Sequence, residues 1–166
     1  MTEKNLVVDG IEINYQGFFD LNGLLKTIDK YSSEKGYSKE EKRRSEKVTP
    51  SGKEFSIELR HTKKKSDFEI LMIKMRMNIT NIKDAEVIRE GIKTRLQKGN
   101  VNIIFDAWII SEYETRWEQK PWYYFLRSIY ERSIKVIFTG KLEGEVSNDC
   151  HHIYDNIKAH LNLYKT

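Results

Sequence analysis

Residues 55–79, FSIELRHTKKKSDFEILMIKMRMNI, decide the fold, because apolar and polar side chains alternate on both sides of a lysine-rich turn. Successive side chains of a β-strand point to opposite faces, so each half of this stretch presents one apolar face and one charged face. The polar residues 62–67 separate the two halves. The pattern predicts two antiparallel strands joined by a short turn.

The alternation continues toward the C-terminus. Residues 101–113, VNIIFDAWIISEY, have the most regular strand pattern of the chain, and residues 88–96 alternate more weakly. The apolar spacing near four is also compatible with a helix from about Asp84, but Gly91 and Thr94 favour a strand. With turns expected at 81–84 and 98–100, the four segments predict an antiparallel meander. Strands this long must twist and curve, and a curved sheet under a helix could enclose a cavity.

The N-terminal region predicts a short strand followed by a helix. Residues 10–19 alternate weakly, and residues 21–35 carry apolar side chains at helical spacing. Asp20 is placed to accept hydrogen bonds from the first amides of this helix, and Gly36 to adopt the left-handed turn that ends it. Residues 38–53, SKEEKRRSEKVTPSGK, contain almost no apolar side chain and are expected to form a charged connecting loop.

Two further helices are expected after the meander. Pro121 favours a helix start, and the apolar residues after it are spaced to form a buried stripe of Trp122, Phe125, Leu126, Ile129 and Tyr130. Residues 134–140 fit either a short strand or the end of that helix, and the last helix is expected to begin at Ser147 or Asn148. Together the elements predict a single α+β domain over residues 1–166, with a mostly antiparallel, long-stranded twisted sheet and about three helices packed largely on one face.

The composition is that of a folded chain. The 166 residues are 39% hydrophobic and 33% charged and include seven Phe, nine Tyr and three Trp, too many aromatics for a disordered chain. A single cysteine excludes an intrachain disulfide framework and fits a reducing compartment, so a cytoplasmic location is expected. No apolar run has the length or purity of a signal peptide or a membrane-spanning helix, so neither is expected.

The common nucleotide-binding and catalytic motifs are absent from the sequence. It contains no GxxxxGK[ST], GxGxxG, HExxH, GxSxG or EF-hand loop, so no cofactor is expected and a non-catalytic role is favoured. Asp106, Glu112 and Glu114 share one face of the strand at 101–113, which leaves a hydrolase or isomerase as an alternative. The simpler interpretation is that these carboxylates are exposed and pair with basic residues of neighbouring strands.

The last predicted helix concentrates residue types that bind metals. His152 and His160 are two helical turns apart, about 12 Å, which is too far for one ion. We therefore expect no metal, and we expect a solvated helix start with one buried thiol. The residues concerned are Asp149, Cys150, His151, His152, Asp155 and His160.

Six aromatic residues lie between residues 113 and 125. They could pack the second predicted helix onto the sheet, or they could form a binding surface, because aromatic side chains bury much area and retain polar groups. Trp122 and Phe125 fit the buried stripe, whereas Tyr123 and Tyr124 do not. The candidate partner-binding residues are Trp117, Trp122, Tyr123 and Tyr124.

Positive charge is concentrated between Lys39 and Lys65. This segment has ten Lys and Arg and five Glu, a net charge of +5, whereas the whole chain carries +4. Concentrated positive charge favours contact with phosphates, but the interleaved glutamates and the lack of a known nucleic-acid-binding pattern favour a solvated loop. The candidate phosphate-contacting residues are Lys42, Arg43, Arg44, Lys63, Lys64 and Lys65.

The sequence therefore predicts a non-catalytic binding or interaction domain. Its partner, a protein or an extended ligand, would meet the aromatic residues 113–125 or the curved sheet. The alternative is a nucleic-acid accessory protein that contacts phosphates through residues 39–65. Homo-oligomerisation is also open, because long antiparallel edges invite pairing unless charges such as Lys93 and Arg95 protect them.

Overall fold

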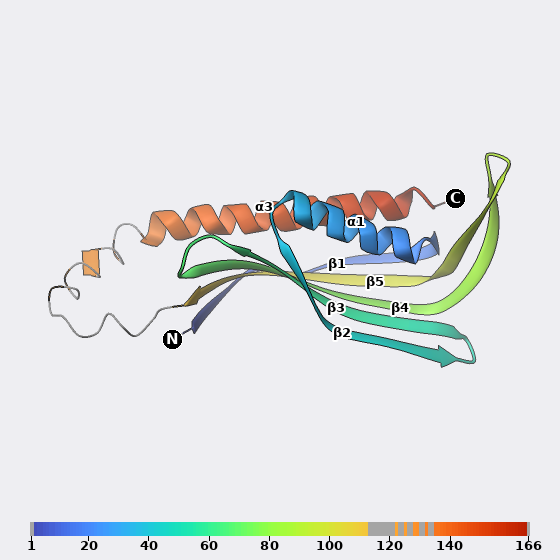
Figure 1. Ribbon diagram of the computed structural model, residues 1–166, viewed down its shortest axis with the longest axis horizontal. Helices are drawn as coiled ribbons and strands as arrows, with labels where there is room; N and C mark the ends of the chain where they lie inside the picture. The colour runs from blue at the N-terminus through green and yellow to red at the C-terminus, as the bar shows by residue number, and fades with distance from the viewer. Residues whose placement is uncertain are drawn as a thin grey trace.

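The computed structural model describes residues 2–112, 122, 125, 128, 129, 132 and 135–165, which form one sheet with two helices on one of its faces (Figure 1). The strands are β1 (Thr2–Phe19), β2 (Ser38–Thr49), β3 (Gly52–Lys64), β4 (Glu69–Arg89) and β5 (Ile92–Glu112). The helices are α1 (Leu21–Glu34) and α3 (Lys135–Asn162). The strand order is β1-β5-β4-β3-β2, and every neighbouring pair is antiparallel.

The predicted α+β class and antiparallel sheet are confirmed, but the helix count is not. The described residues contain two continuous helices, α1 and α3, whereas about three were expected. The helix expected from Pro121 falls mostly outside those residues. Helix α3 begins at Lys135, twelve residues before Ser147, so residues 135–140 are helical and are not a strand. Ser147 and Asn148 lie inside this helix and do not cap its start.

The core is a layer between the helices and one face of the sheet. Alternate side chains of β3, β4 and β5 point toward the helices, as the alternation in the sequence predicts. Helix α3 lies along the sheet, and Tyr154 packs edge-on against Phe105 of β5, with ring centroids 5.5 Å apart. The side chains of α3 that enter the core are spaced three or four residues apart, at Leu142, Val146, Cys150, Ile153, Ile157 and Leu161.

The opposite face of the sheet, which we call the open face, carries charge pairs between strands. Glu58 of β3 lies 3.0 Å from Arg60 on its own strand and 3.8 Å from Lys74 on β4. Asp106 of β5 lies 2.9 Å from Arg76 on β4. Side chains paired across neighbouring strands point to the same face, so these charges line up across the middle of the sheet.

The prediction of turns at 81–84 and 98–100 is wrong, because both segments lie within continuous strands. Strands β4 and β5 are 21 residues long each. The chain reverses at Glu90 and Gly91, whose φ angles of 49° and 78° are both left-handed, as a two-residue hairpin turn requires. Gly91, which argued against a helix from about Asp84, is therefore part of the hairpin turn. The weak alternation of residues 88–96 reflects the exposed tip of this hairpin.

The residues mistaken for turns bend the hairpin. The pairing of β4 with β5 shifts register between Thr80 and Lys83, and Asn81 between them has a left-handed φ of 55°. Gly99 lies opposite this bend, where a Cβ atom would stand only 2.8 Å from the carbonyl oxygen of Thr80. Beyond the bend the hairpin curves toward the C-terminal end of α3 (Figure 1).

The segment expected to be a charged loop, 38–53, is mostly strand β2 and the turn to β3. Strand β2 is an edge strand whose side chains are almost all exposed, so its sequence shows no apolar face. Charged side chains on an edge strand discourage pairing with another chain. From the absence of apolar residues we predicted correctly that these side chains are exposed. The prediction that the segment is a loop was wrong, because most of it is a strand.

Two details of the N-terminal region also differ from expectation. Strand β1 begins at Thr2 and not near residue 10. Asp20 does precede α1, but its side chain makes no capping hydrogen bond; the amide of Leu21 donates instead to Oε1 of Gln97, at 3.1 Å. Gly36 has a φ of 83°, so the predicted left-handed turn after α1 is present.

Candidate interaction surface

Helix α3 begins before it reaches the sheet. The first core residue of the helix is Leu142, and the next residue, Glu143, accepts a hydrogen bond of 2.9 Å from the side-chain amide of Asn5 on β1. The first turn of α3 projects past the ends of β1 and β5 (Figure 1), and Thr139 in the next turn already faces these strands. The side chains of residues 136–138 are consequently exposed.

Large apolar side chains in this part of the chain face solvent. Six of them, within 17 residues of sequence, are between 37% and 70% exposed. Single exposed apolar residues are ordinary on protein surfaces, but a concentration of this kind is typical of an interaction site. We call these residues the exposed apolar segment: Trp122, Phe125, Ile129, Val136, Ile137 and Phe138.

The first three members of the exposed apolar segment have the spacing of a helix face. Trp122, Phe125 and Ile129 are helical and are separated by three and four residues. The expectation that Trp122 and Phe125 belong to a buried stripe is wrong, since they are 60% and 70% exposed. Spacing reveals an apolar stripe on a helix, but it does not reveal whether another element covers that stripe.

Basic residues accompany the exposed apolar segment. Arg132 and Lys141 are exposed. Between Lys120 and Lys141 the sequence contains five basic residues and a single acidic one, Glu131. Of the predicted partner-binding residues, the structure describes Trp122 and places it in this segment. The other three, Trp117, Tyr123 and Tyr124, lie outside the described residues.

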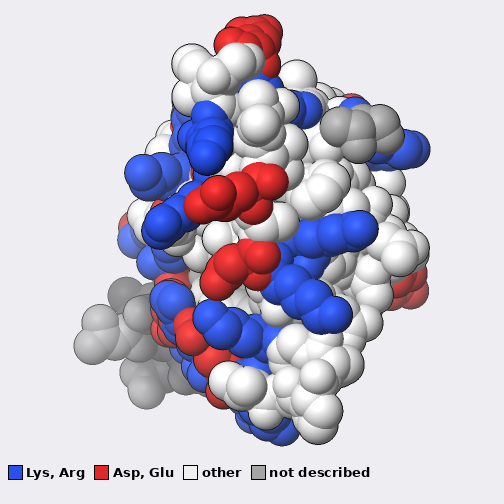
Figure 2. All heavy atoms as spheres, turned by 90° about the vertical axis from the view of Figure 1, so that its right-hand side faces the viewer, with Lys and Arg blue, Asp and Glu red and all other residues white. Residues whose placement is uncertain are grey.

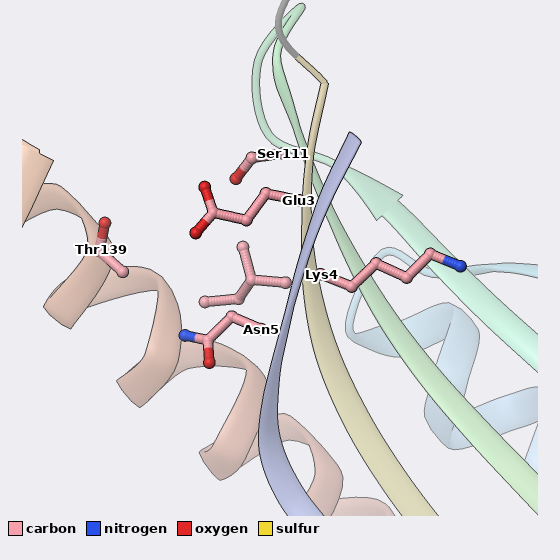
Figure 3. Close-up of a pocket in the computed structure, with 6 residues that line it drawn as sticks. Glu3, Lys4, Asn5, Ser111 and Thr139 are labelled. Carbon is pink, nitrogen blue, oxygen red and sulfur yellow. The ribbon is translucent and has the colours of Figure 1, made fainter. Parts of the chain in front are cut away.

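A shallow pocket of about 140 Å³ lies where the start of α3 approaches β1 and β5 (Figure 3). The side chains of Glu3, Asn5, Ser111 and Thr139 point toward it, whereas Lys4 points to the other side of the sheet. Pockets that enclose a small organic ligand usually measure about 300–1,000 Å³. This pocket is a small polar depression beside the exposed apolar segment, and its volume does not suit an organic substrate.

The basic candidates at the end of β3 are held by acidic partners. Lys63 and Lys65 turn toward α3, where their Nζ atoms lie 2.7 Å and 3.0 Å from the carboxylate of Glu145. Lys64 lies 2.9 Å from Asp67 in the following turn. Each of these three charges is therefore already compensated within the chain.

The basic candidates on β2 are divided between the two sides of that strand. Arg44 lies 3.1 Å from Glu46 and stacks over the ring of Phe55, on the helix-covered side. Arg43 is directly opposite Glu58 on the open face, and Lys42 pairs with Glu40. Figure 2 views the end of the molecule that holds the β2–β3 turn and shows acidic side chains between the basic ones. The six candidates do not form one positive surface.

The candidate catalytic carboxylates are not brought together. Asp106 is almost buried and accepts hydrogen bonds from the amide of Gly10, at 2.8 Å, and from Arg76, at 2.9 Å. Glu112 is exposed at the end of β5, six residues farther along the strand, a distance of about 20 Å. Glu114 lies outside the described residues. The pairing of β1 with β5 shifts register between Val8 and Ile11, and Asp106 holds this irregular part of β1 in place through Gly10, which is a structural role.

The metal-binding residue types of α3 point in different directions. Cys150 is buried, and this burial, with the charges of Asp106 and Asp149, raises the pKa of its thiol to about 12. His152 packs against the ring of Tyr31, and His160 lies 3.3 Å from the hydroxyl of Thr27. In the described part of the chain, no group of three or more potential ligands is placed to hold a metal ion.

Asp149, one of these residues, belongs to a clasp between α3 and the sheet edge. Tyr37 donates a hydrogen bond of 3.0 Å to Oδ2 of Asp149, and Lys63 lies 3.6 Å from the same carboxylate. Burial raises the pKa of Tyr37, and the charge of Asp149 raises it further. The same lysine bonds Glu145, so the clasp fixes this part of α3 to β3.

A second buried polar group was not singled out from the sequence. His61 is fully buried under α1, and neither of its ring nitrogens has a hydrogen-bond partner among the described residues. Burial lowers its pKa to about 4; Asp29 opposes this effect and Lys39 adds to it. Ser32 of α1 is also buried, and a substrate could not reach side chains enclosed to this degree. The sequence does indicate the burial of His61, because this residue continues the apolar alternation of residues 55–61.

Comparisons with known proteins do not assign a family. No family model matches the chain, and no curated protein matches it. Among solved structures, one similar chain is an uncharacterised protein from Rhizobium leguminosarum, with 7% sequence identity over 98% of each chain and a TM-score of 0.25. A TM-score this low supports no conclusion about fold or function. None of the described helices is sufficiently long and apolar to cross a membrane.

Proposed function

We propose that this protein is a non-catalytic α+β binding domain that meets its partner, a protein or an extended ligand, through the exposed apolar segment. The observation that carries the proposal is the exposure of six large apolar side chains between residues 122 and 138. Leaving such side chains in water forgoes roughly 1.5–3 kcal/mol for each one that a partner could bury. A cytoplasmic location, supported by the single buried thiol of Cys150, belongs to the same proposal.

The domain can present this segment without losing its own stability. The core residues of α3 begin at Leu142, and the clasp of Tyr37 and Lys63 with Asp149 holds the middle of the helix to the sheet. The exposed apolar segment lies before these contacts in the sequence. A partner that covers Ile137 or Phe125 would therefore add buried surface and would break none of the described core contacts.

Site-specific photocrosslinking tests the proposal. A photoreactive phenylalanine analogue at position 137 should crosslink a defined partner in cells that produce the protein. The same analogue at position 88 is the matched control, because Ile88 and Ile137 are 69% and 66% exposed. Ile88 belongs to the tip of the β4–β5 hairpin and Ile137 to the start of α3, and these two parts lie at opposite ends of the molecule (Figure 1). Identical products at both positions, or none at position 137, would contradict the proposal.

Nucleic-acid binding is the second candidate, and the exposure of β2 supports it. Lys42, Arg43 and Arg44 are all exposed on this edge strand, where a phosphate backbone could reach them. Their acidic neighbours argue for weak binding. Fluorescence anisotropy with labelled single- and double-stranded RNA and DNA at two salt concentrations tests this candidate. It predicts binding that collapses with added salt, and no binding at low salt would eliminate it.

A further inference from the structure

We propose that the exposed apolar segment attaches the domain to an anionic membrane surface. This inference rests on the proposed function and names the partner as a lipid bilayer. The apolar side chains of the segment enter the region between the lipid headgroups and the acyl chains, and its basic side chains meet lipid phosphates. The contact is peripheral, with the sheet outside the bilayer.

The residue types of the segment are those of an interfacial helix. Such helices combine Trp, Phe and aliphatic side chains on one side with Lys and Arg on the other, and aromatic side chains favour the headgroup level. Trp122, Phe125 and Ile129 are helical, exposed and spaced as one helix face. Val136 and Ile137, at the start of α3, add two exposed aliphatic side chains.

The charge of this part of the chain favours lipid over a generic protein groove. Five basic residues and one acidic residue lie between Lys120 and Lys141, and Arg132 and Lys141 are exposed. Among the described residues, Arg132 and Lys141 form no ion pair, whereas Lys63 and Lys65 of the β3 end contact Glu145. A basic excess beside exposed apolar side chains is attracted to anionic headgroups at about 1 kcal/mol per Lys or Arg, or roughly a fivefold increase in binding for each.

The fold places the segment where a flat surface can reach it. The first turn of α3 projects past the ends of β1 and β5, so the sheet does not shield that turn (Figure 1). Farther along α3, Glu143 bonds Asn5 and Glu145 bonds Lys63 and Lys65, which keeps the helix fixed to the domain. Binding therefore requires no unfolding of the described core.

Vesicle co-sedimentation tests the inference directly. The full chain is mixed with sucrose-loaded vesicles of phosphatidylcholine, with or without phosphatidylglycerol, at low and at high salt. We expect sedimentation with the anionic vesicles, at least about tenfold weaker binding to the neutral ones, and a loss of binding with added salt.

Paired variants separate the apolar and electrostatic contributions. Phe125→Ser combined with Ile137→Ser should weaken binding by about tenfold or more, because two side chains no longer enter the interface. Arg132→Ser combined with Lys141→Ser should weaken it by about 25-fold at low salt. Ile88→Ser combined with Ile92→Ser is the matched control: these residues are 69% and 68% exposed at the tip of the β4–β5 hairpin, and this change should leave binding unaltered. All the substituted side chains are exposed, so an unchanged thermal unfolding temperature verifies that each variant is folded.

The outcomes distinguish this inference from the proposed function. No sedimentation with anionic vesicles at low salt overturns the membrane inference, and so does an equal loss of binding in the Ile88/Ile92 control. If the protein does not sediment with vesicles but position 137 crosslinks one defined protein, the proposed function stands with a protein as its partner. If position 137 also crosslinks nothing, the proposed function falls as well.

Discussion

Ile103 and Ile104 are neighbours on β5, yet they belong to the two faces of the sheet, and their surroundings differ completely. Ile103 is fully buried under the helices, among the apolar side chains of the core. Ile104 lies on the open face, directly opposite Arg76 of β4 and Glu12 of β1. The covered face is held together by excluding water, and the open face by side-chain pairs that remain in contact with water. The same strand can serve both because its side chains alternate.

The comparison predicts very different costs for the same substitution at adjacent positions. Ile103→Ala should lower the free energy of unfolding by about 2–5 kcal/mol, because it leaves a cavity in a closed core. Ile104→Ala should lower it by less than about 1.5 kcal/mol, because its side chain is only half-buried and the site can be filled by solvent. Urea denaturation of both variants measures the difference. Equal losses would show that the open face is covered in solution, for example by a second copy of the chain.

His61 is an ionisable group on the covered face, so its titration tests how completely this face is shielded from water. Its pKa is lowered to about 4 in the folded protein from 6.5, so between these values the unfolded chain binds more protons than the folded one. The free energy of unfolding should therefore fall as pH is lowered from 6.5 to 4, by up to about 3 kcal/mol. Chemical denaturation across this pH range measures the loss.

The control for the pH effect is His61→Leu, which removes the titrating group and keeps an apolar side chain. Its stability should decline less steeply over the same pH range. Burial also lowers the pKa of His160, so some slope should persist in the variant. A variant with the slope of the wild type would show that His61 is not the group responsible.

Asp106 tests whether a charged side chain on the open face can matter as much as a core residue. It is almost buried there, and its carboxylate joins the amide of Gly10 to Arg76. Asp106→Ala should lower the free energy of unfolding by about 1–3 kcal/mol, because the Gly10 amide and Arg76 lose a charged partner. Glu112→Ala removes an exposed carboxylate from the same strand and should cost less than about 0.5 kcal/mol. Thermal or urea unfolding of the two variants checks the contrast.

The faces of the strands could be predicted from the sequence, whereas the lengths of the strands could not. Alternation of apolar and polar residues assigned Phe55, Ile57 and Leu59 to the core correctly, because β geometry leaves no other arrangement. It failed for β2, which has no buried face, and at residues 81–84, where a bend within one strand uses the same residue types as a turn. A strand such as β2, whose two faces are both exposed, leaves no periodic signal in a single sequence, and neither does a bulge.

The candidate surface was found in part. The concentration of aromatic residues pointed to the part of the chain that carries the exposed apolar segment, and Trp122 was among the predicted residues. The contribution of Val136 and Ile137 was missed, because α3 was expected to begin about twelve residues later than it does. Exposure depends on where a helix leaves the sheet, and that position is set by contacts such as Leu142 with the core. Such contacts join residues far apart in the sequence, which local patterns do not record.

The smallest predicted effect concerns a charge pair that typifies the open face. Glu58 and Arg60 are both within reach of solvent, and their side chains lie 3.0 Å apart. A double-mutant cycle with Glu58→Gln and Arg60→Gln should give a coupling energy of about 0.2–1 kcal/mol, and concentrated salt should reduce it, because water and ions screen such pairs. A coupling well above this range that salt leaves unchanged would mean that the pair is shielded from water. In that case both faces of the sheet would be covered in solution, and the contrast between Ile103 and Ile104 would fail for the same reason.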